Sequence, residues 1–304
     1  MTVLDKVEQR PVAGLREPSR GTGSCPLVLG ECVQGQVDDG PHFLITAPIT
    51  LESRAEFIAD LSRDCISVEP AHCVKSLQAV SRYLTGQSLP LCGSLRVATG
   101  ARTSLGFGTS TADIAASLRA AAAAWHRSVS PEAISEIASA IEPTDGSMYA
   151  GSVAYAHREG RLLEALGPLP QFRAIVMLCG DGVDTVAFDE YRVHFRYSAE
   201  AGQKLRQAWW MVRESIRTMD VRLLGQAGMI SAEINQKLLP KPLFEEIRDA
   251  VEPLGAAGLL VAHSGSLLGI LLDPEKGFRQ CRERVLRFMQ DLKVTAWCEV
   301  GNYR

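Results

Sequence analysis

The stretch Ser104–Asp113, SLGFGTSTAD, combines residue types that suit the binding of an anion. Gly106 and Gly108 permit a sharp turn and a close approach of a ligand to the backbone. Three hydroxyl residues, Thr109–Thr111, then lead into a segment rich in Ala, Leu and Ile, which predicts a helix to about His126. A hydroxyl is expected to cap that helix, and the N–H groups of its first turn favour a phosphate. A loop that only starts a helix is the alternative, because short glycine-rich matches are weak signals.

Two carboxylates follow the next predicted helix. Ser130-Pro131 is typical of a helix start, a hydroxyl cap followed by proline at the first position, and the helix is expected to end at Glu142-Pro143-Thr144-Asp145. Carboxylates in a polar turn can bind a hard cation or accept a proton. Asp145 can equally cap the turn after Pro143.

Composition narrows the classes of protein. A net charge of −3 and a pI near 6.1 give no indication of a nucleic-acid or membrane partner. None of the eight cysteines forms a C-x-x-C pair, and their apolar settings suggest reduced, buried thiols in the cytoplasm. The first residues lack the apolar core of a signal peptide, and no apolar run reaches transmembrane length.

The predicted elements mix helices and strands without regular βαβ alternation, so the expected class is α+β. Residues 1–20 are expected to be a flexible leader, 21–35 a strand, a turn and a second strand, and 160–171 a domain boundary. Further strands are predicted at 42–50, 53–66, 94–98, 172–179, 294–300 and on both sides of an HSGS turn within 255–273. Further helices are predicted at 70–83, 199–219, 221–236, 243–251 and 278–292.

Three small-residue turns, at 21–35, 104–113 and 262–269, stand in an order that resembles the GHMP kinases, such as galactokinase, homoserine kinase and mevalonate kinase. The central turn has the pattern G-x-G-[ST]-[ST]-x-A. The resemblance is strongest to the L-threonine kinase branch, which acts in cobalamin biosynthesis and propanediol utilisation. It is carried by CPLVLGECVQG, STADIAAS, IEPTD, VDTVAF, INQKLLPKP and AHSGSLLGILLD, in this order.

This resemblance implies a two-domain GHMP kinase fold, with an N-terminal ribosomal S5 domain 2-like part at 21–165 and a C-terminal ferredoxin-like part at 166–304. It implies ATP and Mg²⁺ as cofactors and L-threonine as acceptor, giving L-threonine O-3-phosphate for cobalamin nucleotide-loop assembly. Leu105 stands where the branch loop has Lys, so another hydroxy amino acid or amino alcohol, homoserine included, stays open. A non-catalytic ATP-binding sensor is the alternative from a different class, and assembly as a homodimer stays open.

The resemblance also assigns roles to residues. The nucleotide is expected to contact the loop at Ser104, Leu105, Gly106, Phe107, Gly108, Thr109, Ser110 and Thr111. Ser110 and Glu142 are the expected Mg²⁺ ligands, with Glu136 as a rival that is more typical of a solvated helix face. Asp145 is expected to orient the acceptor hydroxyl or to take its proton.

Substrate contacts are expected from three further segments. They comprise Glu31, Gln34, Asp184, Thr185, His263, Ser264, Gly265 and Ser266. Glu31 can also be a plain turn carboxylate, and a histidine such as His263 is more often a buried structural residue. Lys241 is read as a surface lysine, with a contact to a phosphate or carboxylate as the alternative. Trp209 and Trp210 are read as core and interface packing.

Overall fold

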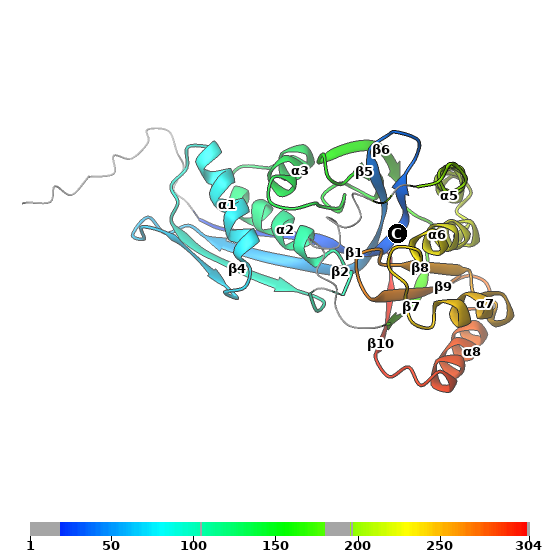
Figure 1. The fold of residues 1–304 in the computed structure, drawn as a ribbon. Helices are drawn as coiled ribbons and strands as arrows, with labels where there is room; N and C mark the ends of the chain where they lie inside the picture. Colours follow the sequence, from blue (N-terminus) through cyan, green and yellow to red (C-terminus); the bar gives the residue numbers. More distant parts are fainter. Residues whose placement is uncertain (1–18, 104, 180–194, 196, 303–304) are drawn as a thin grey trace, which may run out of the picture.

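A long antiparallel hairpin of β1 (Arg20–Gln36) and β2 (His42–Ile58) organises the sheet (Figure 1). The computed structural model describes residues 19–103, 105–179, 195 and 197–302. In this part of the chain, ten strands form one sheet in the order β10-β7-β9-β8-β1-β2-β4-β3, with β5 pairing to β2 and β6 to β5. The remaining strands are β3 (Ile66–Glu69), β4 (Gly93–Thr99), β5 (Ser152–Ala156), β6 (Arg161–Gly167), β7 (Arg173–Leu178), β8 (Gly258–Val261), β9 (Leu267–Leu272) and β10 (Trp297–Gly301).

The helices are grouped at the two ends of this sheet. Figure 1 shows α1, α2 and α3 at the β1, β2 and β4 end, and α6, α7 and α8 beside β8 and β9. Helix α5 packs on α6 and β1. Their bounds are α1 (Val74–Gly86), α2 (Thr109–Ala124), α3 (Pro131–Ser139), α5 (Ala199–Thr218), α6 (Val221–Asn235), α7 (Phe244–Leu254) and α8 (Phe278–Asp291). The mixed helices and strands confirm the α+β class.

The alanine run of α2 lets this helix lie directly on the sheet. A side chain at Gly21 or Gly23 of β1 would collide with the α2 backbone at Ala120 or Ala116, so helix and strand approach closely. Nearly every residue of α2 is buried as a result. This packing fixes where the first turn of α2 points, and that turn borders the candidate site.

The segment 21–35 is one strand and not the predicted strand, turn and strand. The turn expected near Gly30 is instead a set of β-bulges, where the register of β1 against β2 shifts between Pro26 and Val33. Pairing continues because β2 lies on one side and β8 on the other, where Glu31 pairs with Val261. β1 therefore joins the two halves of the sheet, and it carries Glu31 to the join. The strand expected at 53–66 is likewise the continuation of β2, which runs unbroken to Ile58, followed by the separate β3.

The hairpin of β5 and β6 was not predicted from the sequence. β6 occupies part of 160–171, the range expected to hold a domain boundary. The division into two domains stays a prediction. The other predicted helices and strands are present within a few residues of their expected bounds.

The cysteines differ in part from expectation. All eight are free, but Cys65 and Cys298 are exposed while the other six are buried. Trp209 packs on Phe43 with ring centroids 4.5 Å apart, as predicted for a packing residue, whereas Trp210 is exposed and is not part of the core. Among the helices that the structure describes, none combines the length and apolar character needed to cross a bilayer.

Candidate active site

A cavity of about 430 Å³ opens where the first turns of α1 and α2, the bulged part of β1 and the turn after α3 meet. Of the predicted residues it brings together ten, namely Glu31, Gln34, Gly106, Gly108, Thr109, Ser110, Thr111, Glu142, Asp145 and Ser264. Leu105, Phe107, His263, Gly265 and Ser266 do not line it. Ser104, Asp184 and Thr185 lie outside the described residues.

The expected hydroxyl cap of α2 is wrong. The N-cap residue is Gly108, in a left-handed conformation with φ of 64°, and no side chain caps the helix. The hydroxyl residues Thr109 to Thr111 form the first helical turn instead and line the cavity. The N–H groups of that turn therefore keep their capacity to bind an anion at the helix N-terminus.

The loop before α2 is held by the turn between β8 and β9. The backbone N–H groups of Ser266 and Leu267 donate to the Leu105 carbonyl over 2.9 and 3.2 Å. A side chain at Gly106 would collide with Ala262. The predicted glycine loop and the HSGS turn thus contact each other through Gly265 and Ser266.

Ser110 and Glu142, the expected Mg²⁺ ligands, are in direct contact. The Ser110 hydroxyl donates to Oε1 of Glu142, and Lys75 Nζ donates to Oε2 of the same carboxylate. Glu142 is buried, whereas its rival Glu136 is exposed. Mg²⁺ in proteins is ordinarily bound through one or two carboxylates together with substrate phosphates, so this pair of oxygen donors fits it. Within the described residues there is no group of three or more His, Cys, Asp and Glu side chains that could hold a metal.

Asp145 combines a turn contact with a place in the cavity. Its Oδ1 accepts from the Ser147 backbone N–H over 2.8 Å, and its own N–H donates to Thr111 Oγ1 over 3.3 Å. Burial raises the pKa of Asp145 to about 6; the hydrogen bonds from Ser147 oppose this shift, and the charges of Glu31 and Glu142 add to it. A carboxyl with a pKa near neutrality is suited to accept a proton.

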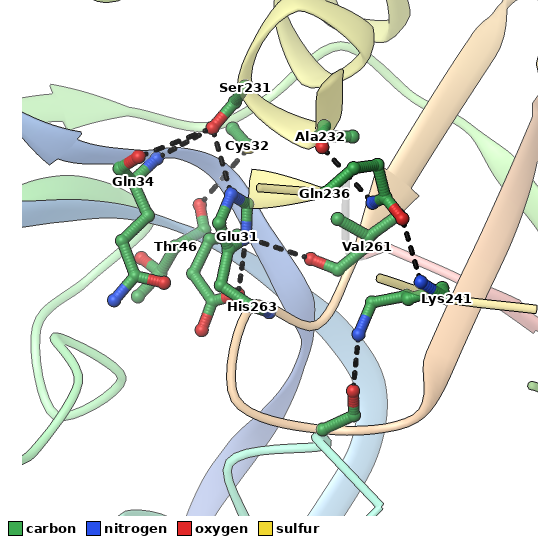
Figure 2. A network of polar contacts seen from close by, with 11 residues as sticks. Glu31, Cys32, Gln34, Thr46, Ser231, Ala232, Gln236, Lys241, Val261 and His263 are labelled. Carbon is green, nitrogen blue, oxygen red and sulfur yellow. Dashed lines mark hydrogen bonds and ion pairs between the residues drawn. The ribbon is translucent and has the colours of Figure 1, made fainter. Parts of the chain in front are cut away.

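Glu31 is held by a buried chain of polar groups (Figure 2). Its Oε2 accepts from the backbone N–H of His263 over 2.9 Å and lies 3.2 Å from His263 Nδ1. His263 Nε2 lies 2.9 Å from Ser231 Oγ, which accepts from the Gln34 N–H over 2.9 Å. Nδ1 faces two acceptors, Glu31 Oε2 and the Val261 carbonyl, so Nδ1 carries a proton. His263 is thus a buried residue that orients a cavity carboxylate.

Lys241 is buried, and the surface interpretation is wrong. Its side chain is 7% exposed, and Nζ donates to the Gly265 carbonyl in the turn behind the glycine loop. Its backbone N–H donates to Gln236 Oε1 over 2.7 Å (Figure 2). Burial lowers the pKa of Lys241 to about 8, while the Glu31 charge acts in the opposite direction.

Several cavity residues were missed by reasoning from the sequence. They include His72, Lys75, Thr103, Asp113, Thr144 and His157. The position of Lys75 gives one indication of a role. A cation in the first turn of a helix is unfavourable for the helix dipole, so a lysine there suggests a contact with a negative group elsewhere. Asp113 accepts from Ser53 and Thr99 hydroxyls over 2.6 Å each, which links α2 to β2 and β4.

Known proteins resemble this chain over most of its length. Residues 72–154 match the model of the GHMP kinases N terminal domain. The chain is 29% identical over 266 residues to an L-threonine kinase of Salmonella typhimurium, covering 86% of each chain. It is 28% identical to an L-threonine kinase of Citrobacter freundii, covering 82% of this chain and 85% of that one.

Solved structures share the fold. A mevalonate kinase from L. major in complex with R-mevalonate matches with a TM-score of 0.68 at 15% identity, over 96% of this chain and 98% of that one. A homoserine kinase from Cytophaga hutchinsonii matches with a TM-score of 0.70 at 12% identity, over 95% and 96%. Residues 72–154 are thus a GHMP kinase N-terminal domain, and the chain is an ATP-dependent kinase that acts on a hydroxyl group.

Proposed function

We propose that this chain transfers the γ-phosphoryl group of ATP to the side-chain hydroxyl of L-threonine, giving L-threonine O-3-phosphate. The phosphoryl-transfer part rests on one observation, the Ser110–Glu142 contact in the same cavity as the Asp145 carboxylate. The choice of acceptor is supported by the similarity to two L-threonine kinases over more than four fifths of the chain.

The nucleotide side of the proposal uses the uncapped first turn of α2. Backbone N–H groups from Gly106 to Ser110 would hold phosphate oxygens, and the Ser110 hydroxyl with the Glu142 carboxylate would hold Mg²⁺. Bound ATP would supply the phosphoryl group, and Mg²⁺ would neutralise charge on it. Gly106 and Gly108 let the backbone turn tightly enough to reach the phosphates, with φ values of 111° and 64°.

The acceptor side uses Asp145 and the β1 wall. Asp145 would orient the threonine hydroxyl and accept its proton at a carboxylate oxygen, which its raised pKa of about 6 favours. Glu31 and Gln34 would bind the substrate ammonium group. Gln34 Oε1 is buried without a hydrogen-bond partner among the described residues, and this residue lines the cavity. An amino-acid ammonium group supplies three donors to such oxygens.

A role in cobalamin nucleotide-loop assembly and a cytoplasmic location belong to the same proposal. Both rest on the resemblance to the L-threonine kinase branch. Neighbouring genes for cobamide synthesis would support the pathway, and genes for a different amino-acid pathway at that locus would argue against it.

The direct test is a substrate screen. Purified chain with ATP and Mg²⁺ is incubated with L-threonine, L-serine, L-homoserine or ethanolamine derivatives, and both ADP and the phosphorylated product are measured. We expect turnover to be fastest with L-threonine and lost in Asp145→Asn. Faster turnover of L-homoserine would reassign the acceptor. ATP binding without turnover of any acceptor would favour the non-catalytic ATP-binding sensor over the threonine kinase.

A further inference from the structure

Lys75 lies at the centre of the proposed cation site, although no role has been assigned to it so far. It is the second residue of α1, its side chain is 46% exposed, and it lines the cavity. Its ammonium group donates to Oε2 of Glu142, while the Ser110 hydroxyl donates to Oε1. Both oxygens of the carboxylate are therefore engaged, one by the residue proposed to share the metal and the other by a positive charge.

The charges around the cavity make this lysine unusual. Its described lining contains four carboxylates, those of Glu31, Asp113, Glu142 and Asp145. Lys75 is the sole lysine or arginine in the same described lining. A nucleotide brings further negative charge, so the lining needs positive charge beside the phosphates when it binds. Backbone N–H groups supply part of it, and Lys75 is the side chain in place to supply more.

The position of Lys75 also conflicts with its own helix. A cation in the first turn of α1 meets the positive end of the helix dipole, and α1 has no acidic residue in that turn. The Glu142 carboxylate, which pairs with Lys75, compensates for this. Mg²⁺ bound by Glu142 and Ser110 would compete for the same carboxylate. A lysine ammonium on its flexible four-carbon stem can then turn to a neighbouring phosphate oxygen.

We propose that Lys75 is an exchangeable cation, which occupies Glu142 in place of a divalent metal ion in the nucleotide-free chain and moves to a phosphate oxygen when the nucleotide binds. This rests on the proposed function in one respect, the assignment of Ser110 and Glu142 as metal ligands. The proposal gives Lys75 a role in nucleotide binding. It also makes metal binding at Glu142 depend on the departure of Lys75. A merely structural ion pair between α1 and the turn after α3 is the competing explanation.

The two explanations predict opposite effects on metal binding. Lys75→Met removes the competitor for Glu142, so the nucleotide-free variant should bind Mn²⁺ several-fold more tightly than the wild type, measured by the paramagnetic resonance of free Mn²⁺. Glu142→Gln in either background should abolish this site. Loss of a merely structural ion pair would leave Mn²⁺ affinity unchanged or weaken it, and that result would overturn the proposal.

Nucleotide binding gives the second measurement. Lys75→Met should weaken the binding of metal-free ADP by about tenfold, the effect of removing one hydrogen bond to a charged group. Lys204→Met is the matched control, because Lys204 is 52% exposed and pairs with Glu200 on α5, away from the cavity lining. It should leave both Mn²⁺ and ADP affinities unchanged. An unchanged ADP affinity in Lys75→Met would contradict the proposed contact between Lys75 and a phosphate oxygen.

Two safeguards keep the test decisive. Lys75→Gln provides a second neutral side chain, and the rate at which acetic anhydride labels Lys75 in the wild type should fall when ADP binds. A labelling rate unaffected by ADP would count against the proposal even if both variants fold poorly. Failure of the threonine assay with the expected Mn²⁺ and ADP results would overturn the acceptor and leave the Lys75 inference standing.

Discussion

Gly108 lies directly against the carboxylate of Asp145. A β-carbon on Gly108 would come within 2.5 Å of Asp145 Oδ2, and the backbone there has a φ of 64°. The N-cap of the proposed phosphate-binding helix therefore touches the group proposed to activate the acceptor. This contact fixes the distance between the proposed phosphate-binding turn of α2 and the Asp145 carboxylate.

Gly108→Ala should separate these two groups. The added methyl group must displace either the loop or Asp145, and a misplacement of about 1 Å costs roughly 100-fold in rate. We expect kcat to fall by about that factor while circular dichroism stays unchanged. Gly86→Ala is the control, because Gly86 ends α1 and a methyl group added there would meet no other atom within 4 Å. Near-normal kcat in Gly108→Ala would show that the contact has no part in catalysis.

Activity should depend on the ionisation of Asp145. The pKa of this carboxyl is raised to about 6 by burial, so half of it is protonated at that pH and cannot accept a proton. We expect kcat/KM to be constant above about pH 7 and to fall about tenfold per pH unit well below 6. Direct chromatography of ADP measures this without coupling enzymes. A profile that stays flat down to about pH 5 would exclude a proton-accepting role with this pKa.

Asp145→Asn should be less active and more stable. The raised pKa means that the folded state binds a proton more tightly than the unfolded chain, so ionising Asp145 costs stability as pH rises from about 4 to 6. Replacing it by Asn should stabilise the fold by on the order of 2 kcal/mol at about pH 7.5 and by much less at about pH 4. We expect kcat to fall at least about 100-fold.

Urea unfolding at the two pH values measures this difference. Ser147 can still donate to the amide oxygen of the variant, so the turn is expected to persist. A variant that is less stable than the wild type at the higher pH would contradict the assignment of Asp145 as a destabilising, buried carboxylate.

Ser231→Ala should weaken acceptor binding without affecting the nucleotide. The Ser231 hydroxyl keeps the His263 ring oriented so that Nδ1 faces Glu31 (Figure 2). We expect KM for L-threonine to rise about tenfold, as for the loss of a hydrogen bond that positions a charged group, with KM for ATP unchanged. Ser215→Ala is the matched control for Ser231→Ala, because Ser215 is also a fully buried serine. It lies on α5 and donates to the Val212 carbonyl. Equal effects of both variants would leave Ser231 with a packing role.

Ser110→Ala and Glu142→Gln should both raise the Mg²⁺ concentration needed for half-maximal activity, by about tenfold or more, because the first removes an oxygen ligand and the second removes the negative charge of one. Glu136→Gln on the exposed face of α3 is the control and should behave as the wild type. Titration of Mg²⁺ at saturating ATP measures the effect. Indistinguishable Mg²⁺ curves for Glu142→Gln and the wild type would remove this carboxylate from the metal site.

Local signals in the sequence predicted most helices and strands correctly. The Ser130-Pro131 start of α3 is a case in point, since Ser130 Oγ accepts from the Ala133 N–H over 3.2 Å. The cap of α2 could not be assigned in the same way. Three consecutive hydroxyl residues offer three equivalent caps, and the contact between Gly108 and Asp145 decides the geometry.

The site was predicted where the family pattern reached it and missed where only the fold brings residues together. Ser110 and Glu142 belonged to quoted motifs, and they do meet. Lys75 belongs to no quoted motif, because its position depends on how α1 packs against α2 and α3. The surface interpretation of Lys241 was wrong for the same reason. A lysine between two prolines gives no sign that its ammonium group will donate to the carbonyl of Gly265.

The hydrogen bonds from Ser266 and Leu267 to the Leu105 carbonyl have a consequence for biosynthesis. The glycine loop leaves the ribosome long before the turn that holds it, so the N-terminal half alone cannot fix the loop. A nascent chain that stops before β8 should therefore bind nucleotide poorly even when α2 is already helical. Competence to bind nucleotide would arise late in synthesis, in one step with the docking of β8 onto β1.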